Sequence, residues 1–452
     1  MFSRNGWLKL AHQLNLRRER GGNGTCGALT IHRAVEGQNG RRVDAREGNA
    51  KVTYPVPRPQ ALRAGGLFDG ERAIGRGMVV IDGGRIVDVD TTGAAPPTAA
   101  EVVDLGEDAW ILPGLIDTHV HLAFDATADV VATVTTANDE TVLEGMRAAA
   151  ARALRAGITT VRDLGDRDYL SLRLRREWVG RPHAGPHIVA SGPPITTPGG
   201  HCHFLGGEAA GAGALRAAVR ARHERGCEVV KVMVSGGVMT PGSAAHASQF
   251  GLADLRVVVE EAHRLGMSTA GHAHAGSAIG DALEAGFDSL EHVTFITEDG
   301  VAADARLVER IARRGVVVGT TVGKLPGARA VSAATTGRRA GIDQVRAELY
   351  LAGARMSAGT DAGIAPDKPH DVLPYGIAHL VDVIGMRPHE ALKAATVVAA
   401  EACGLSEVKG RLRAGMDADL VVVGRDPLAD MSALRDVRAV YRAGHRVVGG
   451  QR

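Results

Sequence analysis

The sequence predicts an α/β fold, namely a (β/α)8 barrel with a small β-sandwich domain built from both chain ends. Three observations lead to this prediction. Apolar strand-like segments alternate with helical segments through the middle of the chain, glycines precede most of the strand segments, and hairpin patterns flank the alternating region on both sides. A doubly wound parallel sheet is the competing architecture, because it shows the same alternation.

The strand candidates of the alternating region are short and apolar, which is typical of buried parallel strands. They lie at 112–117, 158–163, 187–191, 229–234, 268–272, 288–292, 315–320 and 356–360. Helices are expected between them at 140–156, 213–225, 252–265, 275–285, 303–314 and 345–351. Glycines that could cap the preceding helix in a left-handed conformation stand at positions 157, 226, 266, 286, 315 and 353.

Hairpin patterns occupy the flanking regions. Segments 78–81 and 85–89 surround the turn sequence Asp-Gly-Gly, and a similar pair follows at 418–423 and 437–444. An isolated hairpin is marginally stable in water, so the two ends are expected to combine into one sandwich. The predicted domains are a disordered tail at 1–55, the sandwich's first part at 56–111, the barrel at 112–390, and a connecting helix with the sandwich's second part at 391–452.

Composition narrows the class of protein. The formal net charge is +2, aromatic residues make up 3% of the chain, and no basic stripe stands out, which argues against a nucleic-acid partner. Four scattered cysteines without a CxxC pair argue against a disulfide framework. No apolar run is long enough to span a membrane, and no secretory signal pattern opens the chain. We therefore expect a cytoplasmic protein that acts on a small molecule.

Residues able to bind a metal fall at the ends of the predicted strands. Alternate residues of a strand share a face, so the two histidines that close the first barrel strand should point the same way. Chemistry in barrels of this kind collects at the carboxyl ends of the strands. The candidates there are His119, His121, Lys231, His272, His274, His292 and Asp361.

Each candidate also has a structural interpretation. A single histidine at a strand end is often only hydrogen-bonded, and Asp361 could serve as a turn residue. Lys231 lies inside an apolar strand, where it could pair with Glu260 or Glu291. The coincidence of all these residues at the same ends of successive strands favours a metal site.

Three motifs resemble the metal-dependent amidohydrolase superfamily, over about residue 60 to the C-terminus. PGLIDTHVH at 113–121 resembles its first barrel strand, and AGMDADLVV at 414–422 resembles the closing strand of its sandwich. KVMVSGGV at 231–238 is similar to the imidazolonepropionase-related branch with a lysine-bridged binuclear centre. Members of that branch include Xaa-Pro and Xaa-Arg dipeptidases, an ochratoxin-cleaving amidase and phenylurea hydrolases.

The resemblance implies a ligand set. His119, His121 and Asp361 would bind the more buried metal ion, His272 and His292 the second, and carboxylated Lys231 would bridge the two. Imidazole and carboxylate ligands favour zinc over calcium or magnesium. Carbon dioxide would supply the added carboxylate of Lys231, because a protonated lysine has no lone pair with which to bind a metal.

The implied activity is hydrolysis of an amide or related C–N bond in a small molecule, such as an N-acyl amino acid, dipeptide, urea or carbamate. A metal-bridged hydroxide would attack, with Asp361 as the proton shuttle. Loops after the third and fourth barrel strands are long and glycine-rich, so His201, His203 and Val238, together with His274, are candidate substrate contacts. Relatives are commonly homo-oligomers.

Alternative functions remain open at this point. An imidazolonepropionase-like enzyme would use one metal ion and an unmodified lysine. A non-catalytic assembly protein could keep the fold without a working centre, although every expected ligand position is filled here. Phosphotriester or lactone hydrolysis at the same centre is a third alternative.

Overall fold

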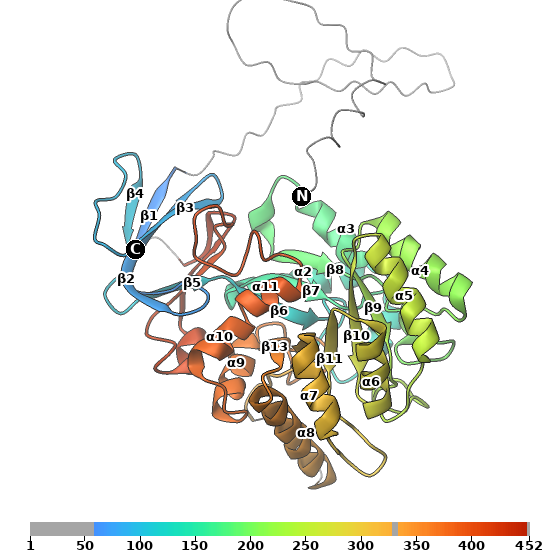
Figure 1. Cartoon of the computed structure of the whole chain (residues 1–452). Helices are drawn as coiled ribbons and strands as arrows, with labels where there is room; N and C mark the ends of the chain where they lie inside the picture. Colours follow the sequence, from blue (N-terminus) through green and yellow to red (C-terminus); the bar gives the residue numbers. More distant parts are fainter. Residues whose placement is uncertain (1–57, 328–332, 450–452) are drawn as a thin grey trace, which may run out of the picture. The chain divides into compact units, whose positions relative to one another are not determined.

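The computed structural model describes residues 58–327 and 333–449, and it describes the side chains from residue 336 onward in the second range. The tail expected at 1–55 lies outside the described residues. Within them, strands gather into a sheet made from the two ends of the chain and into two arcs of parallel strands between (Figure 1).

The parallel strands follow one another around the arcs in chain order. The first arc contains β6 (Leu115–Val120), β7 (Ile158–Asp163) and β8 (His187–Ala190). The second contains β9 (Val229–Met233), β10 (Ser268–Ala273), β11 (Ser289–His292), β12 (Val317–Gly319) and β13 (Arg355–Ser357). All eight predicted strand positions are thus occupied by parallel strands.

Backbone hydrogen bonds join the two arcs at two seams. At the seam between β8 and β9, Ile195 donates to the Lys231 carbonyl at 2.8 Å and accepts from Met233 at 2.8 Å. At the seam between β13 and β6, the amide of Asp361 donates to the His119 carbonyl at 2.7 Å. His121 donates to Ala362 across the same seam at 3.0 Å. The order of strands and both seams are those expected of a (β/α)8 barrel.

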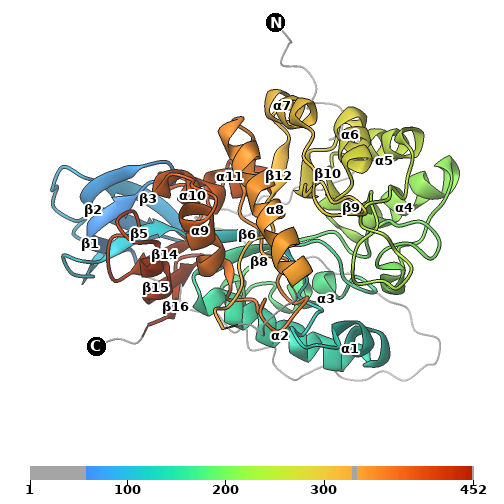
Figure 2. The same ribbon diagram turned by 90° about the horizontal axis from the view of Figure 1, so that it is seen from below.

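Helices alternate with these strands and lie around them (Figure 2). They are α1 (Val130–Thr136), α2 (Asp139–Arg155), α3 (Leu170–Glu177), α4 (Ala212–Arg225), α5 (Leu252–Arg264), α6 (Gly276–Ala285), α7 (Ala305–Arg314), α8 (Ala333–Leu351), α9 (Leu373–Asp382), α10 (Pro388–Ala394) and α11 (Val397–Ala402). Short 3-10 turns lie at Pro182–Ala184, His203–Leu205 and Met431–Arg435. The six glycines expected before strands all have positive φ, between 66° and 92°.

The strand predicted at 112–117 is divided at Gly114, which corrects its boundary. β5 (Trp110–Pro113) belongs to the sheet of the chain ends, and β6 begins the parallel arc at Leu115. A side chain at position 114 would meet the Thr159 hydroxyl, because a Cβ there would lie 2.1 Å from Oγ1. Glycine therefore lets the chain pass from one sheet into the other beside β7.

The sheet of the chain ends runs in the order β16-β15-β14-β5-β1-β2-β3, with β4 paired to β1. Its strands are β1 (Gln60–Phe68), β2 (Ala73–Asp82), β3 (Arg85–Asp90), β4 (Glu101–Asp104), β14 (Leu420–Val423), β15 (Val437–Arg442) and β16 (His445–Val448), together with β5. The two ends meet where β5 pairs antiparallel with β14. They form one continuous sheet around its own apolar core rather than two separately paired sheets.

The AGMDADLVV motif has a structural role in this sheet. Asp419 is buried between two cations, accepting hydrogen bonds from Lys409 and from Arg442, the latter at 3.0 Å. It also accepts the Ala443 amide at 2.7 Å. The motif's aspartate therefore compensates two buried positive charges at the junction of β14 and β15.

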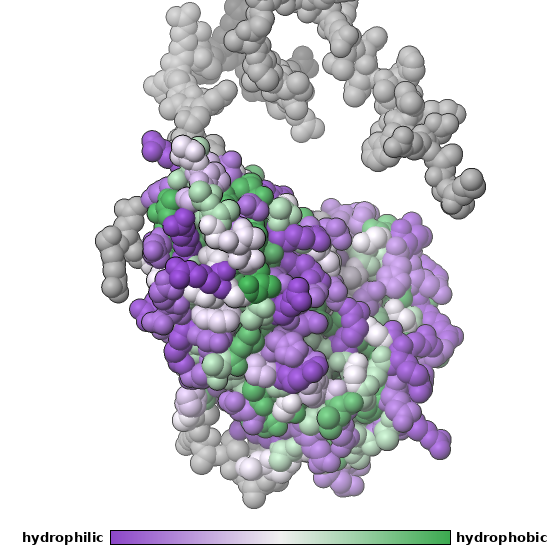
Figure 3. Space-filling model, turned by 60° about the vertical axis from the view of Figure 1, so that its left-hand side comes forward, coloured by the Kyte–Doolittle hydropathy of each residue, from purple (hydrophilic) through white to green (hydrophobic). Residues whose placement is uncertain are grey.

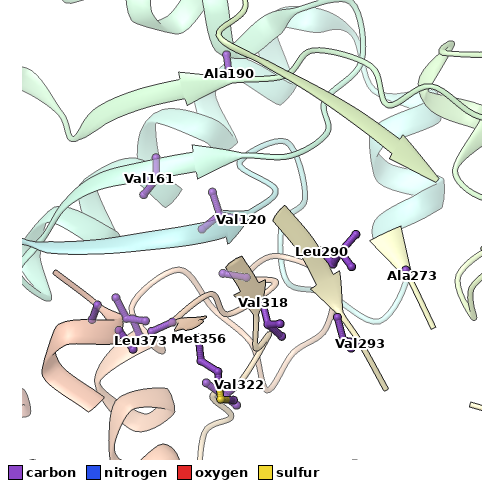
Figure 4. Packing of buried hydrophobic residues seen from close by; sticks show 14 of the residues in the cluster. Val120, Val161, Ala190, Ala273, Leu290, Val293, Val318, Val322, Met356 and Leu373 are labelled. Atoms are coloured by element: carbon purple, nitrogen blue, oxygen red, sulfur yellow. The ribbon is translucent and has the colours of Figure 1, made fainter. Parts of the chain in front are cut away.

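The core of the parallel region is built from aliphatic side chains of successive strands, among them Val120, Val161, Leu290, Val318 and Met356 (Figure 4). On the face shown in Figure 3, hydrophilic residues predominate and apolar residues interrupt them in small groups. Of the helices that the structure describes, none combines the length and apolar character needed to cross a bilayer.

Candidate metal centre

His119, within β6, is oriented by a buried carboxylate. Its Nδ1 lies 3.0 Å from Glu291 Oε2, so Nε2 is left to face the centre. Glu291, on β11, also accepts hydrogen bonds from Arg162 at 2.8 Å and from the Ser289 hydroxyl at 2.9 Å. Such a carboxylate fixes the ring and tautomer of a metal-binding histidine and raises its basicity. Burial lowers the pKa of His119 to about 4, so the ring is neutral at pH 7.

His121 and Asp361 meet across the seam between β6 and β13. The Nδ1 of His121 is 3.0 Å from the Gly165 carbonyl oxygen, and its Nε2 is 3.2 Å from Asp361 Oδ1. The same Oδ1 lies 3.5 Å from His119 Nε2. Burial would raise the pKa of Asp361, but at the low pH at which this carboxyl group titrates, the protonated rings of His119 and His121 outweigh burial and hold the pKa well below the usual range.

Three further histidines form the other half of the cluster. The ring of His292 lies 4.5 Å from the rings of both His272 and His274, measured between centroids. His274 Nδ1 is held by the Thr294 hydroxyl at 2.7 Å, and His292 Nδ1 contacts the Thr321 hydroxyl at 3.1 Å. Burial lowers the pKa of all three rings, that of His274 to about 3, so the rings are neutral at pH 7.

The cluster contains two groups able to hold a cation. In each, one nitrogen or oxygen per side chain lies within 4.8 Å of the others: His119, His292 and Asp361 in one group, and His272, His274 and His292 in the other. His292 thus belongs to both. Three residues at the centre also have left-handed backbone conformations, with φ of 74° at His292, 59° at Asp361 and 47° at Thr321. A positive φ is strained for any residue other than glycine, and such strained backbone conformations are concentrated at functional sites.

Lys231 is buried close enough to both groups to act electrostatically on their histidines. It is 1% exposed, and its Nζ makes no hydrogen bond to any residue that the structure describes. Burial lowers its pKa to about 8, against the opposing charges of Glu291 and Asp361. The pairing with Glu291 considered from the sequence is not formed as a hydrogen bond, because that carboxylate is already occupied by Arg162, Ser289 and His119. A buried lysine amine without a hydrogen-bond partner is unfavourable as a cation. It is consistent with a side chain that is neutral or chemically modified when metal is bound.

The candidate substrate contacts differ in how deeply they are buried and in how close they lie to the histidine cluster. His201 is buried with its ring 4.8 Å from that of His272, and its Nδ1 has no hydrogen-bond partner among the described residues. Gly237 makes room for it, since a Cβ there would lie 2.3 Å from His201 Nε2. His203 instead packs edge-on to Phe204, at 6.2 Å. Val238 is 81% exposed in the loop after β9.

Sequence reasoning missed several residues that support the centre. The sequence indicates Glu291 only as a possible partner for Lys231, and it gives no sign of a role for Arg162, Lys368 or His370. Lys368 donates to the carbonyls of Thr321 at 3.2 Å and Thr360 at 2.5 Å, and His370 Nε2 is 3.0 Å from the His121 carbonyl oxygen. Glu291 directly precedes His292 at the end of a predicted strand, and this position was the one feature of the sequence that could have indicated its role in the site.

The chain matches the model of the Amidohydrolase family over residues 110–447. Since that range covers well over half of the sequence, the chain belongs to this family, and it is a hydrolase. The membership favours an enzyme over the non-catalytic alternative.

Individual relatives agree with the family. Ochratoxinase of Aspergillus niger is 29% identical over 373 residues, which is 73% of each chain. Imidazolonepropionase of Cereibacter sphaeroides is 27% identical over 413 residues, covering 82% of this chain and 94% of the relative. A crystal structure of a Xaa-Pro dipeptidase with bound methionine in the active site superposes with a TM-score of 0.76 at 27% identity, over 86% of this chain and 100% of that one. The family's fold implies a (β/α)8 barrel plus a further domain.

Proposed function

We propose that this protein is a binuclear metal-dependent hydrolase that cleaves an amide or related C–N bond in a small molecule. The observation that carries the proposal is the cluster of imidazoles and one ionised carboxylate close to a buried lysine that has no hydrogen-bond partner among the described residues. Ochratoxinase and the Xaa-Pro dipeptidase support this class of reaction. N-acyl amino acids, dipeptides, ureas and carbamates are the substrate classes considered.

The ligand assignment follows the resemblance to the family, and it divides the histidines differently from the two groups described above. His119, His121 and Asp361 would hold one ion, and His272 and His292 the second, with Lys231 as a carboxylated bridge formed with carbon dioxide. Imidazole and carboxylate donors suit zinc. We also propose that the two arcs close into a complete barrel, because backbone hydrogen bonds join them at both seams and the six proposed ligands come from both arcs.

When bound, the metal ions would lower the pKa of a bound water and polarise the scissile carbonyl group. Asp361 can accept a proton, because its carboxylate is ionised and lies between His119 and His121. It would take the proton from the attacking water and return it to the departing nitrogen. His201 and His274, both neutral, would contact the substrate, with His203 and Val238 in the surrounding loops.

A mononuclear, imidazolonepropionase-like enzyme is the second candidate, and the relative from Cereibacter sphaeroides favours it. It differs in needing one metal ion and an unmodified Lys231. The absence of a hydrogen-bond partner for Lys231 among the described residues fits the binuclear candidate better.

Metal content and a substrate screen together test the proposal. Protein purified without chelator is analysed by inductively coupled plasma mass spectrometry. It is then assayed against N-acyl amino acids, dipeptides, aryl carbamates, phenylureas and imidazolone propionate. Two metal ions per chain with turnover of an amide, urea or carbamate is the expected result. One ion per chain with turnover of imidazolone propionate alone would establish the second candidate, and turnover only of esters would overturn both.

A further inference from the structure

Arg346, on α8, has a guanidinium group that the described residues satisfy only in part. Its side chain is 11% exposed, and its Nη1 donates to Asp343 Oδ1 at 2.8 Å. Its Nη2 is 3.5 Å from the Thr321 hydroxyl, at the outer limit for a hydrogen bond. Its Nε is buried with no hydrogen-bond partner among the described residues. A buried guanidinium N–H without a partner is costly and points to a ligand.

The unused donors lie on one side of the guanidinium. Nε and Nη2 form one edge of the plane, and Asp343 contacts the guanidinium through the remaining nitrogen, Nη1. Asp343 gives the same oxygen to His379, whose Nε2 is 3.0 Å away. Asp343 therefore binds the arginine through Nη1 alone. The opposite edge, which can pair with a carboxylate through two parallel hydrogen bonds, is held only by the long contact between Nη2 and Thr321.

This free edge is next to the candidate metal centre. The Thr321 hydroxyl, which faces Nη2, also contacts His292 Nδ1 at 3.1 Å. One hydroxyl group thus separates the guanidinium from a proposed metal ligand. The positive charge of Arg346 also acts on His274 and on Lys368, both of which lie at the centre.

We propose that Arg346 binds a carboxylate of the substrate through Nε and Nη2, so that the enzyme selects amides bearing a free acid group. The inference rests on the proposed function and narrows it. N-acyl amino acids and dipeptides carry such a group, whereas simple phenylureas and aryl carbamates do not. Arg346 is assigned to substrate selection and Asp361 to proton transfer.

The test compares substrates that differ only in this group. N-acyl amino acids and the matching C-terminal carboxamides are assayed with the wild-type enzyme and with Arg346→Met and Arg346→Lys. The wild type is expected to prefer the acids in kcat/KM by about 10- to 100-fold, the range of a hydrogen bond to a charged group. Arg346→Met should reduce this preference to about one by losing activity on the acids alone. Arg346→Lys should keep the charge and part of the preference.

Arg338→Met provides the matched control, since Arg338 lies on the same helix and is exposed. It should keep the wild-type preference. If Arg346→Met fails to fold, as judged by circular dichroism, Arg346→Lys decides the question, because it must still lower the preference. Equal turnover of acids and carboxamides by the wild type, or equal loss of both in the Arg346 variants, would overturn the inference while leaving the hydrolase intact. Failure of the wild type to cleave any C–N bond would instead overturn the proposed function.

Discussion

Asp361 receives opposing electrostatic influences that decide its protonation. Burial favours the neutral acid, but the two imidazoles 3.2 and 3.5 Å away favour the carboxylate and prevail. A carboxylate that stays ionised at pH 7 can both bind a cation and accept a proton. This dual capacity makes it the residue whose change tests the chemistry most directly.

Asp361→Asn is expected to lower kcat by about 10²- to 10⁴-fold, the usual contribution of a positioned proton carrier. Steady-state assays on the best substrate from the screen measure the loss, and circular dichroism checks that the fold is kept. Asp382→Asn is the control, because Asp382 is exposed at the end of α9. Wild-type turnover by Asp361→Asn would remove this residue from the proton transfer.

Single residues also show where prediction from the sequence stopped. The histidines, Lys231 and Asp361 could be selected because their positions follow apolar strands. Arg162 and Glu291 could not be paired, since they come from different strands and meet only in the folded protein. Arg346 lies in a helix whose sequence gives no sign that its guanidinium lies beside Thr321, which in turn contacts His292.

At the scale of elements, the predicted positions of the parallel strands were confirmed, but the residues predicted to begin and end them were less accurate. Periodicity does not show that an apolar run such as 112–117 serves two sheets, because both halves are equally buried. Helix α8 extends from Ala333, whereas its predicted span began at residue 345, because glycine and threonine weakened the helical pattern there. Helices α1, α3 and α9 were not predicted at all.

Strand β12 illustrates how one small residue supports the centre. A Cβ at Gly319 would lie 2.0 Å from Glu291 Oε2. That carboxylate cannot move aside cheaply, because Arg162, Ser289 and His119 all hold it. Gly319→Ala should therefore lower the free energy of unfolding by about 1–3 kcal/mol, the cost of overpacking. It should also weaken metal binding by about 10- to 100-fold through the loss of the carboxylate that orients His119.

Thermal unfolding and competition with a metal chelator would measure these two effects. Gly280→Ala on α6 is the control, because the nearest atom to a Cβ there is 3.9 Å away. Alanine at this helical position should leave metal affinity unchanged and stabilise by about 0.5–1 kcal/mol. Wild-type metal affinity in Gly319→Ala would show that Glu291 does not orient a ligand.

At the scale of the whole molecule, the proposed metal site spans the seam where the first and last parallel strands meet. His119 and His121 come from β6 and the residue after it, and Asp361 follows β13. A cation held by all three would tie the strands together in addition to the backbone bonds of the seam. Because a ligand that binds only the closed form stabilises it, removing the metal should loosen this seam first.

Hydrogen–deuterium exchange before and after chelation tests this expectation. The amides of His121 and Asp361, which donate across the seam, should exchange faster in the metal-free protein. The amides of the ladder between β14 and β15 serve as the internal reference and should change little. Equal acceleration in both regions would mean that the metal stabilises the fold without bridging this seam.

The pairing of β5 with β14 has a consequence for synthesis. The polypeptide leaves the ribosome with β1, β2 and β5 complete, yet the partner of β5 lies more than three hundred residues downstream in translation order. Until β14 is synthesised, the edge of β5 that pairs with it has no partner, and this apolar edge is exposed while the parallel strands fold. A strand made late therefore pairs with a strand made early, and a nascent chain arrested before β14 should be the form most dependent on chaperones.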